Sequence, residues 1–203
     1  MAEFLGVFLG DGNIASDYQA YISFNLKTEQ PYADYLSELI FSLFRLEAKK
    51  RERPKFGAGD LVMNSCELIR FLLSQGLVKG DKIRHQAGLP PWVFESEGTI
   101  KGSLRGLFDS DGCIYRHSYS INRILYQYPK IAFTAYSPKI RSQIYQLLKQ
   151  LKFCPKEQGN RVHLYSQYET LRFFKECRTH NSWHRGRFEK FCEDLHFEVS
   201  LTK

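Results

Sequence analysis

The sequence predicts an α+β fold made of two tandem halves, and three observations support this prediction. A segment recurs after 100 residues without a gap, as FLGVFLGDGNI at 4–14 and as LRGLFDSDGCI at 104–114. The elements expected after each copy agree in type and order. A chain of 203 residues is also long enough for two units of about 100 residues each. We therefore expect two halves with the element order αββαββα.

The first half is expected to begin with a helix over the repeated segment, 4–14. Alternating polar and apolar residues at 19–25 predict a strand. An amphipathic helix is expected over 31–44, and its first residue is a proline, which suits a first helical turn. The glycines at 57–59 predict the turn of a hairpin, and a short apolar helix at 66–75 follows it.

The second half repeats this order after its own copy of the segment. We expect an alternating strand, a helix that begins with proline, a hairpin turn and a short apolar helix, at 130–136, 138–152, 159–160 and 168–177.

The join between the halves is marked by Pro90 and Pro91, because two prolines stop a helix and stiffen a turn. The expected organisation is a first half at 1–88, a linker at 89–99 and a second half at 100–203.

Charge is distributed unevenly between these halves. The chain has a net charge of +7 and a pI near 9.1. Residues 1–98 carry 11 basic and 13 acidic side chains, a net charge of −2, whereas residues 99–203 carry 18 and 9, a net charge of +9. A basic excess favours a polyanionic partner such as nucleic acid.

Composition excludes several other classes of protein. With 43% hydrophobic residues the chain is not a disordered segment. It contains no apolar run long enough to cross a membrane and does not begin with a secretory signal. Its five cysteines are odd in number and form no CxxC pair, which argues against a zinc site or a disulfide framework. We expect an intracellular protein, in the cytoplasm or an organelle of its host, that is not secreted.

Small residues recur four apart in both predicted helices of the repeat, as Gly6 and Gly10, and as Gly106 and Ser110. A glycine inside a helix costs about 1 kcal/mol relative to alanine, so its presence calls for a reason. One such reason is that a stripe of small residues lets two helix backbones approach closely. We expect these two helices to pack side by side.

Asp11 and Asp111 fall in the last turn of these helices, where the helix dipole disfavours an anion. Side-by-side packing would bring the two carboxylates together, and a shared divalent cation would relieve their repulsion. Hard oxygen ligands suit Mg²⁺. The alternative is that both are solvated aspartates at ordinary helix ends capped by Gly12 and Gly112.

Both segments resemble the signature of the LAGLIDADG homing endonucleases, in the single-chain form with two motifs. The second copy departs from it mainly at Arg105, Phe108 and Ser110. In the first copy Leu9 replaces the inner aspartate, while the terminal acid Asp11 is kept. The resemblance covers nearly the whole chain, because the order of the elements after each motif also fits.

This resemblance implies a pseudo-twofold monomer whose two motif helices form the central interface. Two antiparallel sheets would form a saddle over the DNA major groove, and the enzyme would cut both strands of a long, asymmetric double-stranded target with Mg²⁺. Mn²⁺ or Ca²⁺ could substitute in binding. The resemblance makes Asp11 and Asp111 the metal ligands, with Gly10 and Ser110 beside them in the metal site.

A basic segment stands out independently of the family. Lys49, Arg51, Arg53 and Lys55 recur at period two, so in a strand they would line one side. Pro54 implies an edge or a bulge. The segment is either a DNA-contacting strand or a solubilising edge strand, since lysines also protect sheet edges.

Polar residues alternate with apolar ones in the other predicted strands, which gives each sheet a polar, cationic outer face. On the first sheet the candidate DNA contacts are Gln19, Tyr21, Ser23 and Asn25. On the second they are Lys130, Thr134, Tyr136, Arg161, His163 and Tyr165, together with Arg116 and Arg123 in an expected hairpin after the second motif.

Cations near the metal would assist catalysis in such an enzyme. The best candidate is Lys82, with Lys27 as a second. In the second half the matching positions are expected to be His184 or Arg185, and Tyr136. Each of these could instead be an ordinary surface residue. Two interpretations exist for His180, Asn181 and His184: a ββα-metal nuclease site or a solvated loop. Their spacing favours the loop.

Three functions are compatible with these features. The first is a site-specific DNA endonuclease whose mobility is that of an intron or intein. The second is a cleavage-inactive LAGLIDADG protein that binds nucleic acid, either an RNA maturase or a transcription regulator. The third is an unrelated α+β interaction module, for which the duplicated motif would be an accident. Retention of both terminal aspartates favours the endonuclease.

Overall fold

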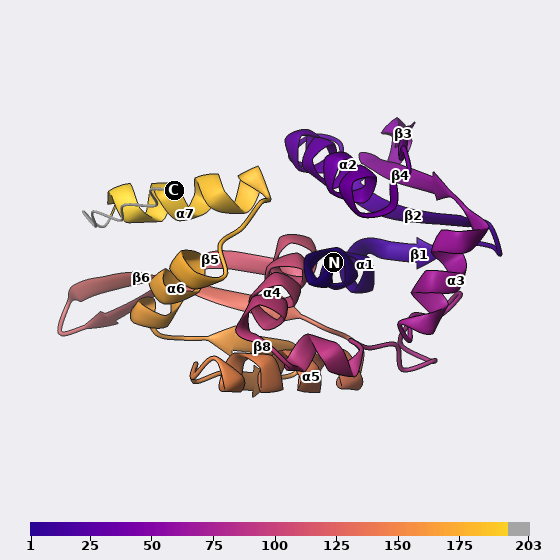
Figure 1. Cartoon of the computed structure of the whole chain (residues 1–203). Coiled ribbons are helices and arrows are strands. Elements are labelled where there is room, and N and C mark those ends of the chain that lie inside the picture. The colour runs from indigo at the N-terminus through magenta and orange to yellow at the C-terminus, as the bar shows by residue number, and fades with distance from the viewer. Residues whose placement is uncertain (195–203) are drawn as a thin grey trace.

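The computed structural model describes residues 1–194, so residues 195–203 of the predicted second half lie outside the described part of the chain. Figure 1 shows the chain with its elements labelled. The first half comprises α1 (Ala2–Asp11), β1 (Gly12–Ile14), β2 (Gln19–Asn25), α2 (Gln30–Phe44), β3 (Lys49–Arg53), a 3₁₀ turn (Pro54–Phe56), β4 (Ala58–Asn64) and α3 (Cys66–Ser74).

The second half follows a short 3₁₀ turn (Pro91–Phe94). It comprises α4 (Glu97–Asp111), β5 (Gly112–Ile121), β6 (Ile124–Thr134), α5 (Pro138–Gln150), β7 (Lys156–Gln158), β8 (Arg161–Leu164), α6 (Gln167–Glu176) and α7 (Ser182–Asp194).

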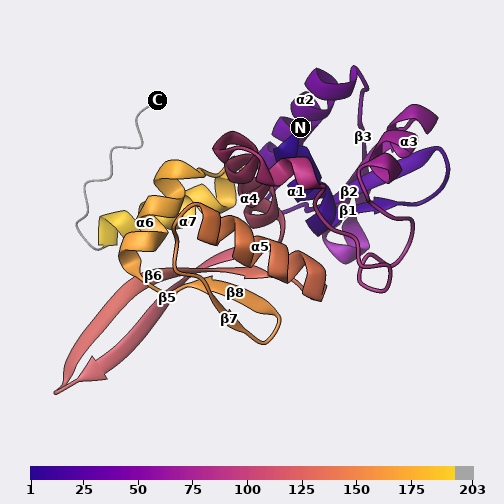
Figure 2. The same ribbon diagram turned by 60° about the horizontal axis from the view of Figure 1, so that its bottom comes forward.

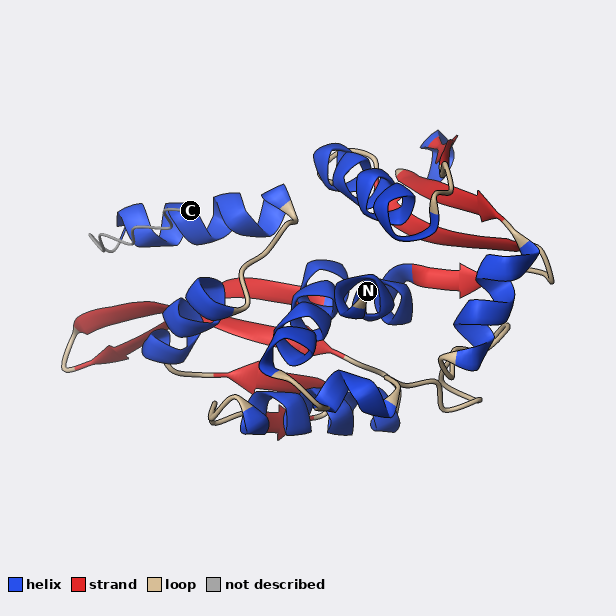
Figure 3. Cartoon of the chain, in the orientation of Figure 1, coloured by secondary structure: helices blue, strands red, loops and turns tan. Residues whose placement is uncertain are grey.

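The two halves share one topology. The sheets have the strand orders β1-β2-β4-β3 and β5-β6-β8-β7, and all these neighbouring strands pair antiparallel. Helices pack against the sheets, as Figure 3 shows. The predicted α+β fold with two αββαββα halves is therefore confirmed. Two details differ from the prediction: α4 begins at Glu97, inside the range expected as linker, and α7 is an additional helix.

Helices α1 and α4 cross at the centre of the molecule (Figure 1). A Cβ atom built on Gly6 would lie 2.4 Å from the carbonyl oxygen of Ser103, and one built on Gly106 would lie 2.1 Å from that of Glu3. Only glycine fits at such distances. The stripe of small residues thus brings the two backbones into direct contact, as the sequence predicts.

Aromatic side chains surround this helix pair. Phe4, Phe8 and Phe108 are almost fully buried, and their apolar faces belong to one core that extends from the first sheet to the second. Burial of a side chain of this size contributes about 1.5–3 kcal/mol. The packing of the motif helices and the hydrophobic core are therefore a single structural unit.

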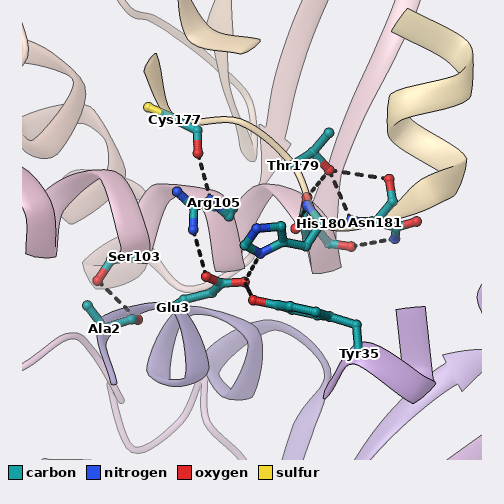
Figure 4. A network of polar contacts seen from close by, with 10 residues as sticks. Ala2, Glu3, Tyr35, Ser103, Arg105, Cys177, Thr179, His180 and Asn181 are labelled. Carbon is teal, nitrogen blue, oxygen red and sulfur yellow. Dashed lines mark hydrogen bonds and ion pairs between the residues drawn. The ribbon is translucent and has the colours of Figure 1, made fainter. Parts of the chain in front are cut away.

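A buried polar network also crosses the interface (Figure 4). Glu3 of α1 accepts a hydrogen bond from Arg105 of α4 at 2.8 Å and another from the Tyr35 hydroxyl at 2.8 Å. The Nδ1 atom of His180 lies 2.7 Å from the same carboxylate. Arg105 also donates to the carbonyl oxygen of Cys177 at 2.7 Å. Elements from both halves are therefore joined through one carboxylate.

The segment before α7 is held by the inner aspartate of the second motif. Asp109 accepts hydrogen bonds from the Thr179 hydroxyl and from the backbone N–H groups of His180 and Asn181. Burial raises the pKa of Asp109 to about 7. Asn181 is fully buried, and His184, in the first turn of α7, is 6% exposed. The prediction of a solvated loop at 180–184 is wrong, because these contacts come from residues about 70 positions away.

The halves differ most in their first hairpins. Strand β1 has three residues, whereas β5 has ten and pairs with β6 along its whole length. Figure 2 shows this hairpin extending well beyond the rest of the second sheet. Its turn residues, Asn122 and Arg123, have φ values of 50° and 66°, as a tight hairpin turn requires.

None of the helices in the described part of the chain is long and apolar enough to cross a membrane.

Replacing Gly106 by alanine should destabilise the fold, because the new methyl group would meet the backbone of α1. We expect a loss of about 2 kcal/mol or more in the free energy of unfolding, measured by urea denaturation. Gly186→Ala is the matched control, since Gly186 lies in helix α7 with nothing near its Cβ position and should be unaffected or stabilised. Equal stability of the two variants would contradict close packing at Gly106.

Candidate active site and nucleic-acid interface

Asp11 and Asp111 are the last residues of α1 and α4. After each of them the chain continues directly into the first strand of a sheet, β1 or β5. A Cβ atom on Gly10 would lie 2.1 Å from the Ser110 hydroxyl and 3.1 Å from the Oδ2 atom of Asp111. The side chains of the second motif therefore occupy the space beside Gly10. This glycine lets the carboxylate of one motif reach the end of the other helix.

The two carboxylates influence each other electrostatically. Loss of hydration at the crowded helix end, together with the negative charges of Asp111 and Glu29, raises the pKa of Asp11 to about 8. Loss of hydration also raises the pKa of Asp111, and the charge of Lys82 opposes this. Ionisation of both carboxylates where the two helices end is therefore unfavourable without a counter-charge, and a cation placed there would stabilise their ionised forms.

Lys82 follows α3 and brings its amino group to this point. Its Nζ atom donates hydrogen bonds to the carbonyl oxygens of Leu9, at 2.8 Å, and Gly10, at 2.5 Å. These carbonyls belong to the last turn of α1, where a cation is favoured by the helix dipole. Loss of hydration lowers the pKa of Lys82, while Asp111 and Asp11 raise it.

Two cavities open beside the helix ends. One, of about 200 Å³, is lined by Gly10, Lys82, Asp111 and Tyr136 among others. The second, of about 470 Å³, is lined by residues that include Asp11, Ser110, Glu29, Trp183 and Arg187. Each terminal aspartate therefore faces its own cavity, and the cation beside it is a lysine in the first and an arginine in the second.

The other predicted catalytic positions differ in their relation to the second cavity. Lys27 is in the turn after β2, and its neighbours Thr28 and Glu29, rather than Lys27, line that cavity. His184 does line it, although its ring is mostly buried and packs 5.0 Å from that of Phe108. Arg185 is exposed and pairs with Glu189.

Sequence reasoning missed Arg187, Trp183 and Glu29, and it assigned Asn181 to a solvated loop. Trp183 and Arg187 are four residues apart on α7 and so share one face of it, a spacing that could have indicated a common site. Glu29 accepts a hydrogen bond from the Asn181 side chain at 2.9 Å and one from the backbone of Asn25 at 2.8 Å. No local pattern in the sequence signals the contact between Glu29 and Asn181, because these residues are 152 positions apart.

The open face of the first sheet carries the predicted polar residues. In its strands the apolar side chains of Ala20, Ile22 and Phe24 are buried, and the alternate residues Gln19, Tyr21, Ser23 and Asn25 lie on the other face. The strand register places Lys49, Arg51 and Arg53 in rows with these residues. Lys55 is outside the strand, because Pro54 begins a 3₁₀ turn, so its expected place in the period-two pattern was wrong.

The open face of the second sheet is more aromatic than the sequence suggests. The Nζ atom of Lys130 lies 5.1 Å from the ring centroid of Tyr128 and 4.5 Å from that of Tyr165, and Lys130 is only 8% exposed. His163 stacks on Tyr165 with ring centroids 5.0 Å apart. Two of the predicted DNA contacts are therefore largely covered by tyrosines.

The remaining predicted contacts of this half are distributed along its strands and turns. Arg116, Thr134 and Arg161 belong to β5, β6 and β8. Arg123 lies in the hairpin turn. Tyr136 lies beyond the end of β6, although a strand was expected to continue to this residue, and it lines the cavity that contains Lys82.

No family model matches the sequence. Among curated proteins, Replication factor C small subunit of Methanocaldococcus jannaschii is 35% identical over 121 residues, which are 58% of this chain and 6% of that protein. This chain therefore spans only a small part of that relative's length.

Solved structures show a more extensive likeness. The LAGLIDADG meganuclease I-AabMI bound to uncleaved DNA has a TM-score of 0.61 at 13% identity, covering 97% of this chain and 91% of that one. I-DmoI in complex with DNA and Ca has a TM-score of 0.61 at 12% identity, covering 93% and 96%. Full-length DUF199/WhiA from Thermatoga maritima has a TM-score of 0.60 at 12% identity, covering 98% and 61%.

This likeness defines the fold class: the chain has the LAGLIDADG fold, with both motifs in one polypeptide. The resemblance drawn from the two sequence motifs is thereby confirmed at the level of the fold.

The chemistry of the helix ends fits a hard divalent cation. Within residues 1–194 no three His, Cys, Asp or Glu side chains gather into a metal cluster. The available donors are the two carboxylates and neighbouring backbone carbonyl oxygens, and phosphate oxygens and water could complete the ligand set of Mg²⁺.

The buried His184 should make stability depend on pH. Burial lowers its pKa to about 4, whereas the unfolded chain binds the proton near pH 6.5. The free energy of unfolding should therefore fall as the pH drops from 6.5 to 4, and His184→Leu should remove about 2–3 kcal/mol of that fall. Urea denaturation at pH 7 and pH 4.5 measures the difference.

His85→Leu serves as the control for this experiment, because His85 is exposed. If His184→Leu showed the same dependence on pH as the wild type, His184 would not be the buried neutral group described above.

Proposed function

We propose that the protein is a site-specific DNA endonuclease that hydrolyses both strands of a double-stranded target at the ends of α1 and α4. The observation that carries the proposal is the placement of the Asp111 carboxylate beside Gly10 of the other motif, at the end of the helix that carries Asp11, whose pKa is raised by burial and by the nearby negative charges. Support comes from the LAGLIDADG fold, which this chain shares with named meganucleases seen with DNA.

The residues at the helix ends have different roles in this proposal. Asp11 and Asp111 hold divalent cations beside the scissile phosphates, with Gly10 and Ser110 bordering the site. When bound, the cations activate water and neutralise charge on the phosphate. The water oxygen would form a new bond to phosphorus and release a proton to solvent, while the ester bond to the leaving oxygen breaks and that oxygen takes up a proton from solvent. Lys82 donates hydrogen bonds to the developing negative charge in the first cavity.

The second cavity offers Arg187 in place of a lysine. Arginine is fully ionised and forms a planar fork of donors, whereas a lysine with a lowered pKa can also exchange a proton. The two strands would therefore be cut with different efficiencies. This proposal replaces His184 and Arg185 by Arg187 as the cation of the second half.

The sheets would bind the duplex on either side of the cleavage point. The cations and polar side chains of their open faces would contact phosphates and base edges in the major groove. Because the first hairpins differ in length, the two halves of the target would differ too, which supports a long, asymmetric site bound by a monomer.

A cleavage-inactive nucleic-acid-binding protein is the second candidate. DUF199/WhiA, which is not named as a nuclease, matches this fold as well as the named meganucleases do. Intron or intein mobility stays a prediction. The curated relative is many times longer than this chain, so nothing beyond the matched segment transfers from it.

Asp11→Asn and Asp111→Asn should each reduce cleavage by about 100-fold or more, because loss of one ligand removes several kcal/mol of transition-state stabilisation. Cleavage is measured on a plasmid library of candidate targets, with Mg²⁺ and with EDTA. Binding of DNA should persist in both variants. Asp34→Asn is the control, since Asp34 is exposed on α2, away from the helix ends.

Cleavage by both variants at the wild-type rate would refute the roles of the two aspartates. A wild-type protein that binds selected DNA and leaves the library intact in Mg²⁺ would establish the second candidate instead.

A further inference from the structure

One row of the first sheet contains a buried acid on β4, the strand between β2 and β3. The register pairs Ser23 of β2 with Asp60 of β4, and Asp60 with Arg51 of β3. Asp60 is 1% exposed, although it points to the polar face of the sheet. It is covered from above by the side chains of Arg51 and Arg53, which are 52% and 40% exposed.

Both oxygens of this carboxylate are used. Its Oδ2 atom accepts two hydrogen bonds from Arg51, from Nε at 3.2 Å and from Nη2 at 2.9 Å. Its Oδ1 atom accepts one from Arg53 Nη2, at 2.8 Å, and one from the Ser23 hydroxyl, at 2.9 Å. Two guanidinium groups are therefore held side by side by a single carboxylate.

The contact with Asp60 determines the direction in which the side chains of Arg51 and Arg53 extend. Strand β3 is at the edge of its sheet, so long cations there could extend outward to solvent or to phosphates. Asp60 instead draws Arg51 and Arg53 inward over β4. The Arg51 guanidinium carbon also lies 5.9 Å from the ring centroid of Tyr21, on β2. The neighbouring Lys50 points to the opposite face and pairs with Asp34 of α2.

Part of each guanidinium remains available to a ligand. Arg51 binds Asp60 through Nε and Nη2, which leaves its Nη1 group free among the described residues. Arg53 hydrogen bonds to Asp60 and Ser23 through Nη2, so its Nη1 group likewise has no partner among the described residues, whereas its Nε atom is buried and cannot reach a ligand. Two fixed, partly exposed forks over the middle of a polar sheet match the pair of acceptors, O6 and N7, that guanine presents in the major groove.

We propose that Asp60 is a positioning residue that fixes Arg51 and Arg53 to read guanine bases in one half of the DNA target. The inference rests on the proposed function, since it requires that the protein binds DNA through this face. Pre-organisation is its physical basis: the carboxylate offsets the repulsion between two adjacent cations and limits their rotamers before DNA arrives.

Within residues 1–194 the second sheet has no pair of arginines held by one buried carboxylate, although Arg116 of β5 pairs singly with the exposed Asp194 of α7. At the comparable face its cation Lys130 is covered by Tyr128 and Tyr165, and Tyr115 lies within hydrogen-bonding distance of His163. The guanine preference that depends on Asp60 should therefore appear on one side of the cleavage point only.

The test is a binding selection from randomised duplex DNA in the presence of Ca²⁺, followed by sequencing of the bound fraction. The wild type should enrich guanine at one or two positions in one half of the selected site. Asp60→Asn replaces one acceptor oxygen by an NH₂ donor, which faces a guanidinium. It should lower that preference about 10-fold or more and leave the preferences of the other half unchanged.

Two further variants make the test decisive. Arg51→Lys keeps the charge but loses the fork, and because Arg51 is half exposed it should fold even where Asp60→Asn does not; it should lose the guanine preference at one position. Asp34→Asn removes the acid partner of Lys50 on the opposite face of β3, and it should keep every preference. Thermal unfolding of each variant checks the fold.

Failure of the inference is distinguishable from failure of the proposed function. A wild type that selects a defined site without guanine in either half overturns the role of Asp60, and so does a folded Asp60→Asn or Arg51→Lys variant with unchanged guanine preference. A wild type that selects no DNA at all overturns the proposed function itself.

Discussion

The contact between the backbones of α1 and α4 is the constraint on which the rest of the structure depends. Gly6 and Gly106 leave no room for a side chain, so the two helices meet carbonyl to Cα at the centre of one continuous core. From that contact both helices run to aspartates at their C-terminal ends. The position of each carboxylate is therefore determined by the packing of Gly6 and Gly106 about one helical turn away. The site is held in place by the same contacts that form the core.

The two halves differ in the elements and side chains that surround this shared helix pair. The second half has an additional helix, α7. Asp109 and Glu3 hold the segment at 179–181 that precedes this helix. Arg187 of α7 lines the second cavity, whereas Lys82 lines the first. The open face of one sheet carries a carboxylate with two arginines, whereas the other carries stacked tyrosines and histidines. A duplicated fold thus presents two chemically different surfaces.

Features set by local pattern were predictable from the sequence. The repeat and the alternation of the strands predict the order of the elements, the faces of the sheets and the pairing of the motif helices. Long-range contacts were not predictable: His184 belongs to a polar segment yet is buried by Phe108, and Asp60 meets its arginines across a hairpin. Lys55 deviates because Pro54 ends the strand, although the proline itself was visible in the sequence.

The central claim, that carboxylates from opposite halves share divalent cations at a scissile phosphate, is tested most directly by a crystal structure of the protein with its DNA and Mn²⁺, using anomalous scattering from the metal. The account predicts anomalous peaks between Asp11 and Asp111, at about 2.1 Å from their carboxylate oxygens, with a phosphate oxygen on the far side. Manganese bound elsewhere on the DNA complex, with both aspartates free of metal, would contradict it.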